Sequence, residues 1–160
     1  MLALDCEFDG HNGRLISMAL SATDGDEFYE VTPDSDKIVA TEWVTNNVLP
    51  VLHKAPIASY SEFREKLWDF LRRHPQEIIV ADSPADFVYL MEQCHFMDGD
   101  KYAYINLDLK MYFVISGPYQ SAMPHNALED AKALKKWFVQ VRTTEVPPVV
   151  KPGEVILRSA

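Results

Sequence analysis

The N-terminal part of the chain consists of short apolar runs separated by turn-forming residues. Residues 1–8 form the first run and residues 15–22 the second, and Asp24-Gly25 separates the second run from a third at residues 27–32. Runs of this length are typical of strands, and Asp-Gly is a frequent turn in tight hairpins. The pattern therefore predicts an antiparallel meander of three strands.

The rest of the chain alternates helical and strand patterns. Helices are indicated by apolar side chains that recur at one helix face and by capping residues before them. Strands are indicated by short β-branched or aromatic runs that end at polar or proline-containing segments. These signals predict helices at residues 42–49, 59–74, 84–94 and 126–141, strands at 78–81 and 102–105, and a short helix or turn at 109–115.

This order of elements predicts the fold class. A strand meander followed by helices that alternate with single strands is typical of an α/β domain. We expect a mixed five-stranded sheet flanked by helices, in which the first three strands are antiparallel and the later ones parallel. Residues 1–144 form the expected domain, and the proline-rich residues 145–160 form an extended C-terminal tail.

Composition and charge narrow the functional classes. The 160 residues are 48% hydrophobic and carry a net charge of −9, which argues against a protein that grips nucleic acid by neutralising its phosphates. No apolar run approaches the length of a membrane span, so no membrane partner is expected. Cys6 and Cys94 fall in apolar positions without metal-type spacing, and we expect buried thiols in a cytoplasmic protein.

The first predicted strand ends with two acids, Asp5 and Glu7. Residues two apart in a strand point to the same side, so these carboxylates lie together. A shared divalent cation would remove their mutual repulsion, and oxygen ligands suit Mg²⁺ or Mn²⁺. The alternative is that the strand simply ends here and both acids are solvated.

Three further polar residues lie at the starts of predicted helices. Asp86 opens the helix after the strand at residues 78–81, where it could equally complete a capping box. Asp130 borders the apolar stripe of the last helix and faces the sheet, although an acid in the first turn also suits the helix dipole. His125 directly precedes that helix, in a position where a histidine is usually only exposed.

The order of these residues resembles the DEDDh family of 3′-5′ exonucleases, the DnaQ-like branch of the ribonuclease H-like fold. The three family motifs match Asp5-Cys-Glu7, Asp82-Ser-Pro-Ala-Asp86 and His125-Asn-Ala-Leu-Glu-Asp130. Asp82 departs from the family pattern, where asparagine is usual, which puts in doubt how a substrate strand is held there. The short length and the strand meander look most like the small bacterial exoribonucleases of the ribonuclease AS type.

The resemblance implies a ribonuclease H-like fold and a metal-dependent 3′-5′ exoribonuclease. Such an enzyme releases nucleoside 5′-monophosphates from the 3′ ends of single-stranded RNA with two divalent cations, Mg²⁺ or Mn²⁺. It implies that Asp5, Glu7, Asp86 and Asp130 hold the cations and that His125 is the general base. Family precedent also makes a homodimer the expectation.

Two roles are left open by the sequence. Phe8 is a candidate for contacting the terminal base or sugar, but strand alternation equally predicts a core phenylalanine opposite the acids. Lys132, Lys135 and Lys136 could guide a nucleic acid strand, although a solvated helix face is the simpler interpretation.

Two other functions also remain open. The chain could be an exodeoxyribonuclease of the proofreading type, since nothing in it shows what would detect a 2′-hydroxyl group. It could also be a catalytically silent module that binds nucleic acid ends. The intact acidic positions argue against a silent module, because binding alone does not need them.

Overall fold

The computed structural model describes residues 1–10, 13–33, 35–37, 39–98, 101–115 and 117–144. The predicted tail at residues 145–160 lies outside the described residues. The elements follow one another as β1 (Leu2–Phe8), β2 (Leu15–Ala22), β3 (Glu27–Val31), α1 (Glu42–Asn47), α2 (Tyr60–Arg73), β4 (Ile78–Ala81), α3 (Pro84–Cys94), β5 (His95–Asp98), β6 (Lys101–Tyr104), β7 (Lys110–Phe113) and α4 (Ala127–Thr144), with short 3-10 helices at Ser35–Lys37 and Leu49–Val51.

The main sheet has five strands in the order β3-β2-β1-β4-β7. The first three strands are antiparallel, and β4 pairs parallel with β1 and with β7. Gly25 adopts a φ of 98° in the turn between β2 and β3, which a residue without a Cβ atom tolerates best. The predicted α/β class and mixed five-stranded sheet are confirmed, and the arrangement is consistent with a ribonuclease H-like fold.

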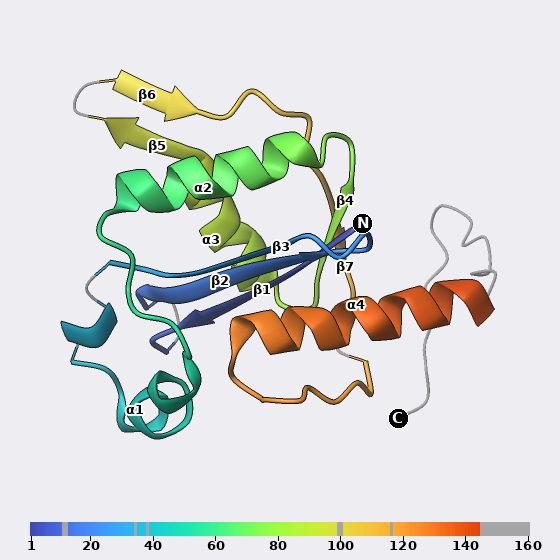
Figure 1. Cartoon of the computed structure of the whole chain (residues 1–160), viewed down its shortest axis with the longest axis horizontal. Coiled ribbons are helices and arrows are strands. Elements are labelled where there is room, and N and C mark those ends of the chain that lie inside the picture. Colours follow the sequence, from blue (N-terminus) through green and yellow to red (C-terminus); the bar gives the residue numbers. More distant parts are fainter. Residues whose placement is uncertain (11–12, 34, 38, 99–100, 116, 145–160) are drawn as a thin grey trace, which may run out of the picture.

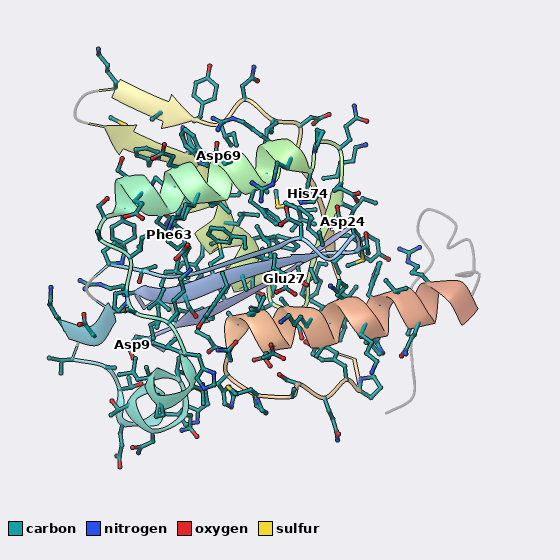
Figure 2. All side chains as sticks on the ribbon, viewed as in Figure 1. Asp9, Asp24, Glu27, Phe63, Asp69 and His74 are labelled. Carbon is teal, nitrogen blue, oxygen red and sulfur yellow. The ribbon has the colours of Figure 1, made fainter. Side chains whose placement is uncertain are left out.

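The helices cover both faces of this sheet (Figure 1). On one face, α2 and α3 pack against alternate residues of β1, including Leu2 and Leu4. Phe63 of α2 is fully buried in this layer and meets Phe28 of β3 edge to face, with ring centroids 5.6 Å apart (Figure 2). The large apolar side chains of the domain are therefore concentrated between α2, α3 and the sheet.

The other face is covered by α4 through small side chains. Ala3 of β1 and Ala19 of β2 pack against Ala127, Ala131 and Leu134 of α4, and all of these residues are buried. Small residues at both surfaces bring the helix backbone close to the strands. Since Asp5 and Glu7 lie on the same face of β1 as Ala3, the close approach of α4 determines what lies next to these acids.

Two predictions about the strands are wrong. Residues 102–105 were expected as the fifth strand, but β6 pairs with β5 in a separate two-stranded sheet. The fifth strand is β7, in the segment expected as a short helix or turn. The sequence of a short apolar run does not distinguish a strand from a helix. This run becomes a strand because it pairs with β4, in a register that begins with Ile78 opposite Lys110.

The buried stripe of α3 also differs from its prediction. Phe87, Leu90, Met91 and Cys94 have the spacing of one apolar helix face, which predicts that they form the buried stripe. However, Met91 is 39% exposed and Phe87 is only half-buried. The buried residues are instead Asp86, Tyr89, Leu90, Gln93 and Cys94. The helix is thus turned so that a carboxylate and an amide face inward.

Candidate metal centre

β1 carries two acids, Asp5 and Glu7, on the face of the sheet that α4 covers. Asp5 pairs with Ala19 and Glu7 with Ser17 in the ladder between β1 and β2, and the register shifts directly after Glu7. The Oδ2 atom of Asp5 is buried and has no hydrogen-bond partner in the described part of the chain. A buried oxygen in this state has lost its hydration and needs a cation or a donor.

The start of α4 places Asp130 beside these acids. Asn126 caps the helix by accepting a hydrogen bond from the Glu129 amide at 3.2 Å. The carboxylate of Asp130 turns back and accepts a hydrogen bond from the His125 amide at 2.8 Å. Asp5, Glu7 and Asp130 each offer an oxygen, and these oxygens lie within 4.8 Å of one another.

A second group of acids forms where β4 leads into α3. Ser83 caps α3 by accepting a hydrogen bond from the Ala85 amide at 3.3 Å. Asp86 in the first turn is 1% exposed, and its Oδ2 atom has no partner among the described residues. Asp5, Asp82 and Asp86 also offer oxygens within 4.8 Å of one another. Asp5 therefore belongs to both groups.

Asp82 is a site residue that sequence reasoning did not assign. The Tyr119 hydroxyl donates a hydrogen bond to Asp82 Oδ2, which fixes this carboxylate beside Asp5 and Asp86. The family comparison presented Asp82 only as a departure from asparagine. The available signal was its position at the carboxyl end of β4, because β4 is parallel to β1 and their ends lie at the same edge of the sheet.

Burial and mutual repulsion raise the pKa values of the acids. The pKa of Asp5 is raised well above its ordinary value, first by burial and then by the charge of Asp86. Burial, followed by the charge of Asp130, raises the pKa of Glu7 to about 7. Burial, followed by the charges of Asp82 and Glu7, raises the pKa of Asp86 to about 8. Burial also raises the pKa of Asp130.

This arrangement fits divalent cations. Without positive charge nearby, the protein would hold several of these buried carboxylates protonated near neutral pH. Carboxylate oxygens are the preferred ligands of hard cations such as Mg²⁺ and Mn²⁺. The unpartnered Oδ2 atoms of Asp5 and Asp86 are free to accept such ions.

His125 lies at the edge of the acidic cluster. It adopts a φ of 68°, a left-handed conformation directly before α4. Its imidazole packs edge to face against Trp43 of α1, with ring centroids 4.8 Å apart. The backbone of His125 is thus tied to Asp130 while its side chain contacts α1. Trp43 is 53% exposed and was not anticipated from the sequence.

Phe8 lies between the core and a pocket. Its ring packs against Tyr89 of α3, with centroids 4.9 Å apart, as expected for the face opposite the acids. It also lines a pocket of about 370 Å³ together with Glu7 and Trp43. Asp9, one residue further on, accepts a hydrogen bond from the Thr41 amide at 2.9 Å and so links the end of β1 to the start of α1 (Figure 2).

The three lysines of α4 differ in their surroundings, because Lys136 is exposed whereas Lys132 and Lys135 are partly buried. Lys135 donates hydrogen bonds to Ser21 Oγ and to the Ala22 carbonyl, at 2.8 and 3.0 Å. Lys132 pairs with Glu27 and Glu129 at 3.4 and 3.0 Å. The interpretation of the lysines as a solvated face is wrong for Lys135, because β2 lies within its reach.

Part of the chain is similar to proteins that are named 3′-5′ exoribonucleases. No model of a known protein family matches the chain. Two curated relatives, both named 3′-5′ exoribonucleases, come from the CDC 1551 / Oshkosh and H37Rv strains of Mycobacterium tuberculosis. Each is 41% identical to this chain over 75 residues. The match spans 42% of this chain and 44% of each relative, so the chain covers less than half the length of these relatives.

Proposed function

We propose that this protein is a 3′-5′ exoribonuclease of the DEDDh type that uses two divalent cations to release nucleoside 5′-monophosphates from single-stranded RNA. The observation that carries the proposal is that two clusters of three acids each have Asp5 in common. The similarity to proteins named 3′-5′ exoribonucleases supports the same reaction class.

The ligands divide between two positions. Asp5, Glu7 and Asp130 would hold one cation, and Asp5, Asp86 and Asp82 the other. When bound, a pair of cations supplies positive charge for the attacking water and for the leaving 3′ oxygen. These ions would also resolve the conflict between a net charge of −9 and a polyanionic substrate.

His125 is the proposed general base. A neutral imidazole accepts the proton from the attacking water, and the loss of this proton makes the water a better nucleophile. The hydrogen bond from the His125 amide to Asp130 holds the residue at the metal ligands. The Trp43 ring limits the movement of the imidazole on its other side.

The pocket beside Glu7 is the proposed place of the terminal nucleotide. Phe8 and Trp43 line it, and aromatic rings stack with bases of any sequence. The pocket adjoins both Glu7 and, through Trp43, the imidazole of His125. A base held there would leave its phosphodiester at the acids.

The test is digestion of 5′-labelled RNA and matched DNA by the purified protein with Mg²⁺, Mn²⁺ or EDTA. We expect RNA to shorten from its 3′ end in Mg²⁺ or Mn²⁺ and not in EDTA. Asp5→Asn and Asp130→Asn remove ligands and should abolish activity while the protein stays folded. Asp69→Asn is the matched control, since Asp69 is exposed on α2, where it forms an ion pair with Arg72 (Figure 2).

Other outcomes would change the proposal. Preferential digestion of DNA would replace the ribonuclease with a deoxyribonuclease. Full activity of Asp5→Asn would refute the metal centre, and absence of both digestion and cation binding by calorimetry would favour a silent binding module.

The cellular setting is also a proposal. Cys6 and Cys94 are buried free thiols, which fits a cytoplasmic protein. Among the described residues, no helix is long and apolar enough to cross a membrane. We infer a homodimer from the family resemblance, and light scattering of the purified protein tests it.

A further inference from the structure

A groove of about 290 Å³ lies between α4 and the segment that precedes it. One wall is formed by residues 118–120 and the other by residues of α4 between positions 133 and 140. Its volume is close to the lower end of the range of small-ligand sites. The side chains with binding chemistry are those of Tyr119, Gln120, Lys136 and Trp137.

The two walls of the groove are packed against each other at one end. A Cβ atom at Gly117 would lie 2.2 Å from Trp137 Cζ2, so the backbone there touches the indole ring. The Tyr119 amide donates to the Gly117 carbonyl at 2.9 Å, and the Tyr119 ring lies 5.9 Å from that of Trp137 between centroids. The groove is therefore formed in the protein before any ligand is bound.

The groove is continuous with the candidate metal centre. Tyr119 lines it, and the hydroxyl of this tyrosine donates a hydrogen bond to Asp82. Ala133 also lines it and lies three residues after Asp130, about one turn further along α4. Lys136 is about 9 Å beyond Asp130 along the helix axis, at 1.5 Å per residue. A short stretch of single strand that starts at the acids can span this distance.

The groove lies on the side of the metal centre where the leaving oxygen is expected. His125, the proposed base, is bonded through its amide to Asp130 of the first acid group, so the attacking water belongs to that group. The attacking and leaving oxygens of an in-line displacement lie on opposite sides of the phosphorus. The leaving 3′ oxygen then lies at the second group, which contains Asp82, and this oxygen belongs to the upstream nucleotide.

The charge of the groove suits a phosphate. Lys136 is exposed and forms no ion pair in the part of the chain that the structure describes, whereas Lys132 is paired with two glutamates. Of the described residues that line the groove, none is acidic, unlike the pocket beside Glu7. In a protein with a net charge of −9, this groove is a place where a phosphate meets a cation without a neighbouring carboxylate.

We propose that this groove binds the nucleotide on the 5′ side of the scissile phosphodiester, an inference that rests on the proposed function. Lys136 contacts the phosphate of this nucleotide, and the part of the Trp137 ring that lines the groove packs against its base. Gln120 is exposed at the groove and offers an amide to the base edge or the sugar. Lys136 is thus the lysine of α4 that guides a strand.

The first test compares two substrates in Mg²⁺. Hexauridylate has an upstream nucleotide, whereas the 4-nitrophenyl ester of uridine 5′-monophosphate has only the terminal nucleotide and its phosphodiester. Lys136→Gln and Trp137→Leu should each lower the ratio of kcat/KM for hexauridylate to that for the ester by about fivefold or more, as for loss of one phosphate contact or one stacked base. Lys101→Gln is the matched control, because Lys101 is exposed on β6, beyond α2 (Figure 1), and its substitution removes the same charge.

The salt dependence gives a second measurement. Loss of one phosphate contact should reduce the slope of log kcat/KM for hexauridylate against log salt by about 0.7 in Lys136→Gln, and Lys101→Gln should keep the native slope. An unchanged ratio together with an unchanged slope in Lys136→Gln overturns the proposal. Equal losses on both substrates also overturn it, because they place the effect at the metal centre. Lys136 is exposed, so its variant decides the question even if Trp137→Leu fails to fold.

Binding separates this proposal from the proposed function. Anisotropy of 5′-fluorescein-labelled hexauridylate is measured with His125→Asn protein in Mg²⁺, with and without Lys136→Gln. If the native protein digests no RNA but binding depends on Lys136, the groove stays and the proposed function is refuted. If the native protein digests RNA and binding does not depend on Lys136, the groove is refuted and the function stays. Absence of both digestion and binding refutes both.

Discussion

Asp5 is the carboxylate that both candidate ion positions share. Its neighbours come from four places in the chain: Glu7 on β1, Asp82 after β4, Asp86 on α3 and Asp130 on α4. Each of these acids alone has an ordinary explanation as a helix cap or a strand end. Their convergence within 4.8 Å in two groups removes that explanation, because buried carboxylates repel one another without a cation.

The proposed role of His125 as general base can be tested with a substitution that fits its backbone conformation. Since its φ is 68°, asparagine fits the left-handed conformation better than alanine. We expect His125→Asn to lower kcat by about 10²–10⁴-fold, the usual contribution of a positioned base. His53→Asn is the matched control, because His53 also has a positive φ, of 51°, and is exposed. Single-turnover rates at saturating Mg²⁺ decide this, and equal rates for the two variants would remove His125 from the reaction.

Asp82 offers a second test. If its carboxylate is a ligand, Asp82→Asn should raise the Mg²⁺ concentration for half-maximal activity by about 10–100-fold, as for loss of a group that supports a metal site. Tyr119→Phe removes only the hydrogen bond to Asp82 and should have the smaller effect. A Mg²⁺ titration of both variants measures this. An unchanged titration for Asp82→Asn would limit Asp82 to holding the substrate strand.

The sequence indicated most residues of the acidic cluster but not the contacts that surround them. Asp5, Glu7, Asp86 and Asp130 were accessible through their spacing and family order. Asp82 and Trp43 were not, because their roles depend on contacts between distant segments. Tyr119 fixes Asp82 from 37 positions away, and α1 brings Trp43 to His125.

At the scale of elements, the start of α4 connects the site to the rest of the fold. Asn126 is buried and caps α4, and its side-chain amide also donates to the Val51 carbonyl at 2.6 Å and to Tyr29 Oη at 3.3 Å. One side chain therefore fixes the helix that carries Asp130.

Replacing this side chain should cost more than loss of an ordinary cap. We expect Asn126→Ala to lower the free energy of unfolding by about 2–3 kcal/mol, because it removes the cap and leaves the Val51 carbonyl without this donor. Ser59→Ala removes the exposed cap of α2 and should cost only about 1 kcal/mol. Urea unfolding of both variants measures the difference. Equal losses would show that the Val51 contact contributes nothing.

Local sequence patterns are sufficient to predict some of the helices and strands. The meander was predictable because the Asp-Gly turn and the apolar runs are local signals. Threonine, serine and asparagine favour helix N-caps, and Thr41, Ser59 and Asn126 accept backbone hydrogen bonds at the starts of α1, α2 and α4. The segment at 110–113 has no comparable local signal, and only its partner β4 makes it a strand.

At the scale of the whole molecule, the acidic cluster should set a pH dependence of stability. Without cations, the folded-state pKa values of Glu7 and Asp86 are about 7 and about 8. In the unfolded chain such groups ionise at about pH 4. The folded state therefore holds more protons over this interval. The contribution of these acids to stability is complete below the unfolded pKa and is lost as the pH rises through the folded values.

The measurement is urea unfolding in EDTA at pH 5, 7 and 9. We expect the free energy of unfolding of the native sequence to fall relative to Asp86→Asn as the pH rises. Saturating Mg²⁺ at pH 9 should restore the free energy of unfolding of the native protein, because a cation that binds only the folded state stabilises it. It should not restore that of Asp86→Asn, because this variant lacks one of the carboxylates that would hold the cation. A free energy of unfolding of the native protein that stays constant or rises relative to that of Asp86→Asn as the pH increases would contradict the assignment of buried, uncompensated acids.

The outer edge of β7 has a practical consequence for handling the protein. β7 is an edge strand of the sheet, and Met111, Tyr112 and Phe113 on it are 43–48% exposed. Such an edge can add a strand from another copy and so promote precipitation. Mutual repulsion at a charge of −9 opposes this near pH 7, but the repulsion vanishes near the isoelectric point of about 4.9. Concentrated samples should therefore be least soluble near pH 5, and storage well above that pH keeps copies apart.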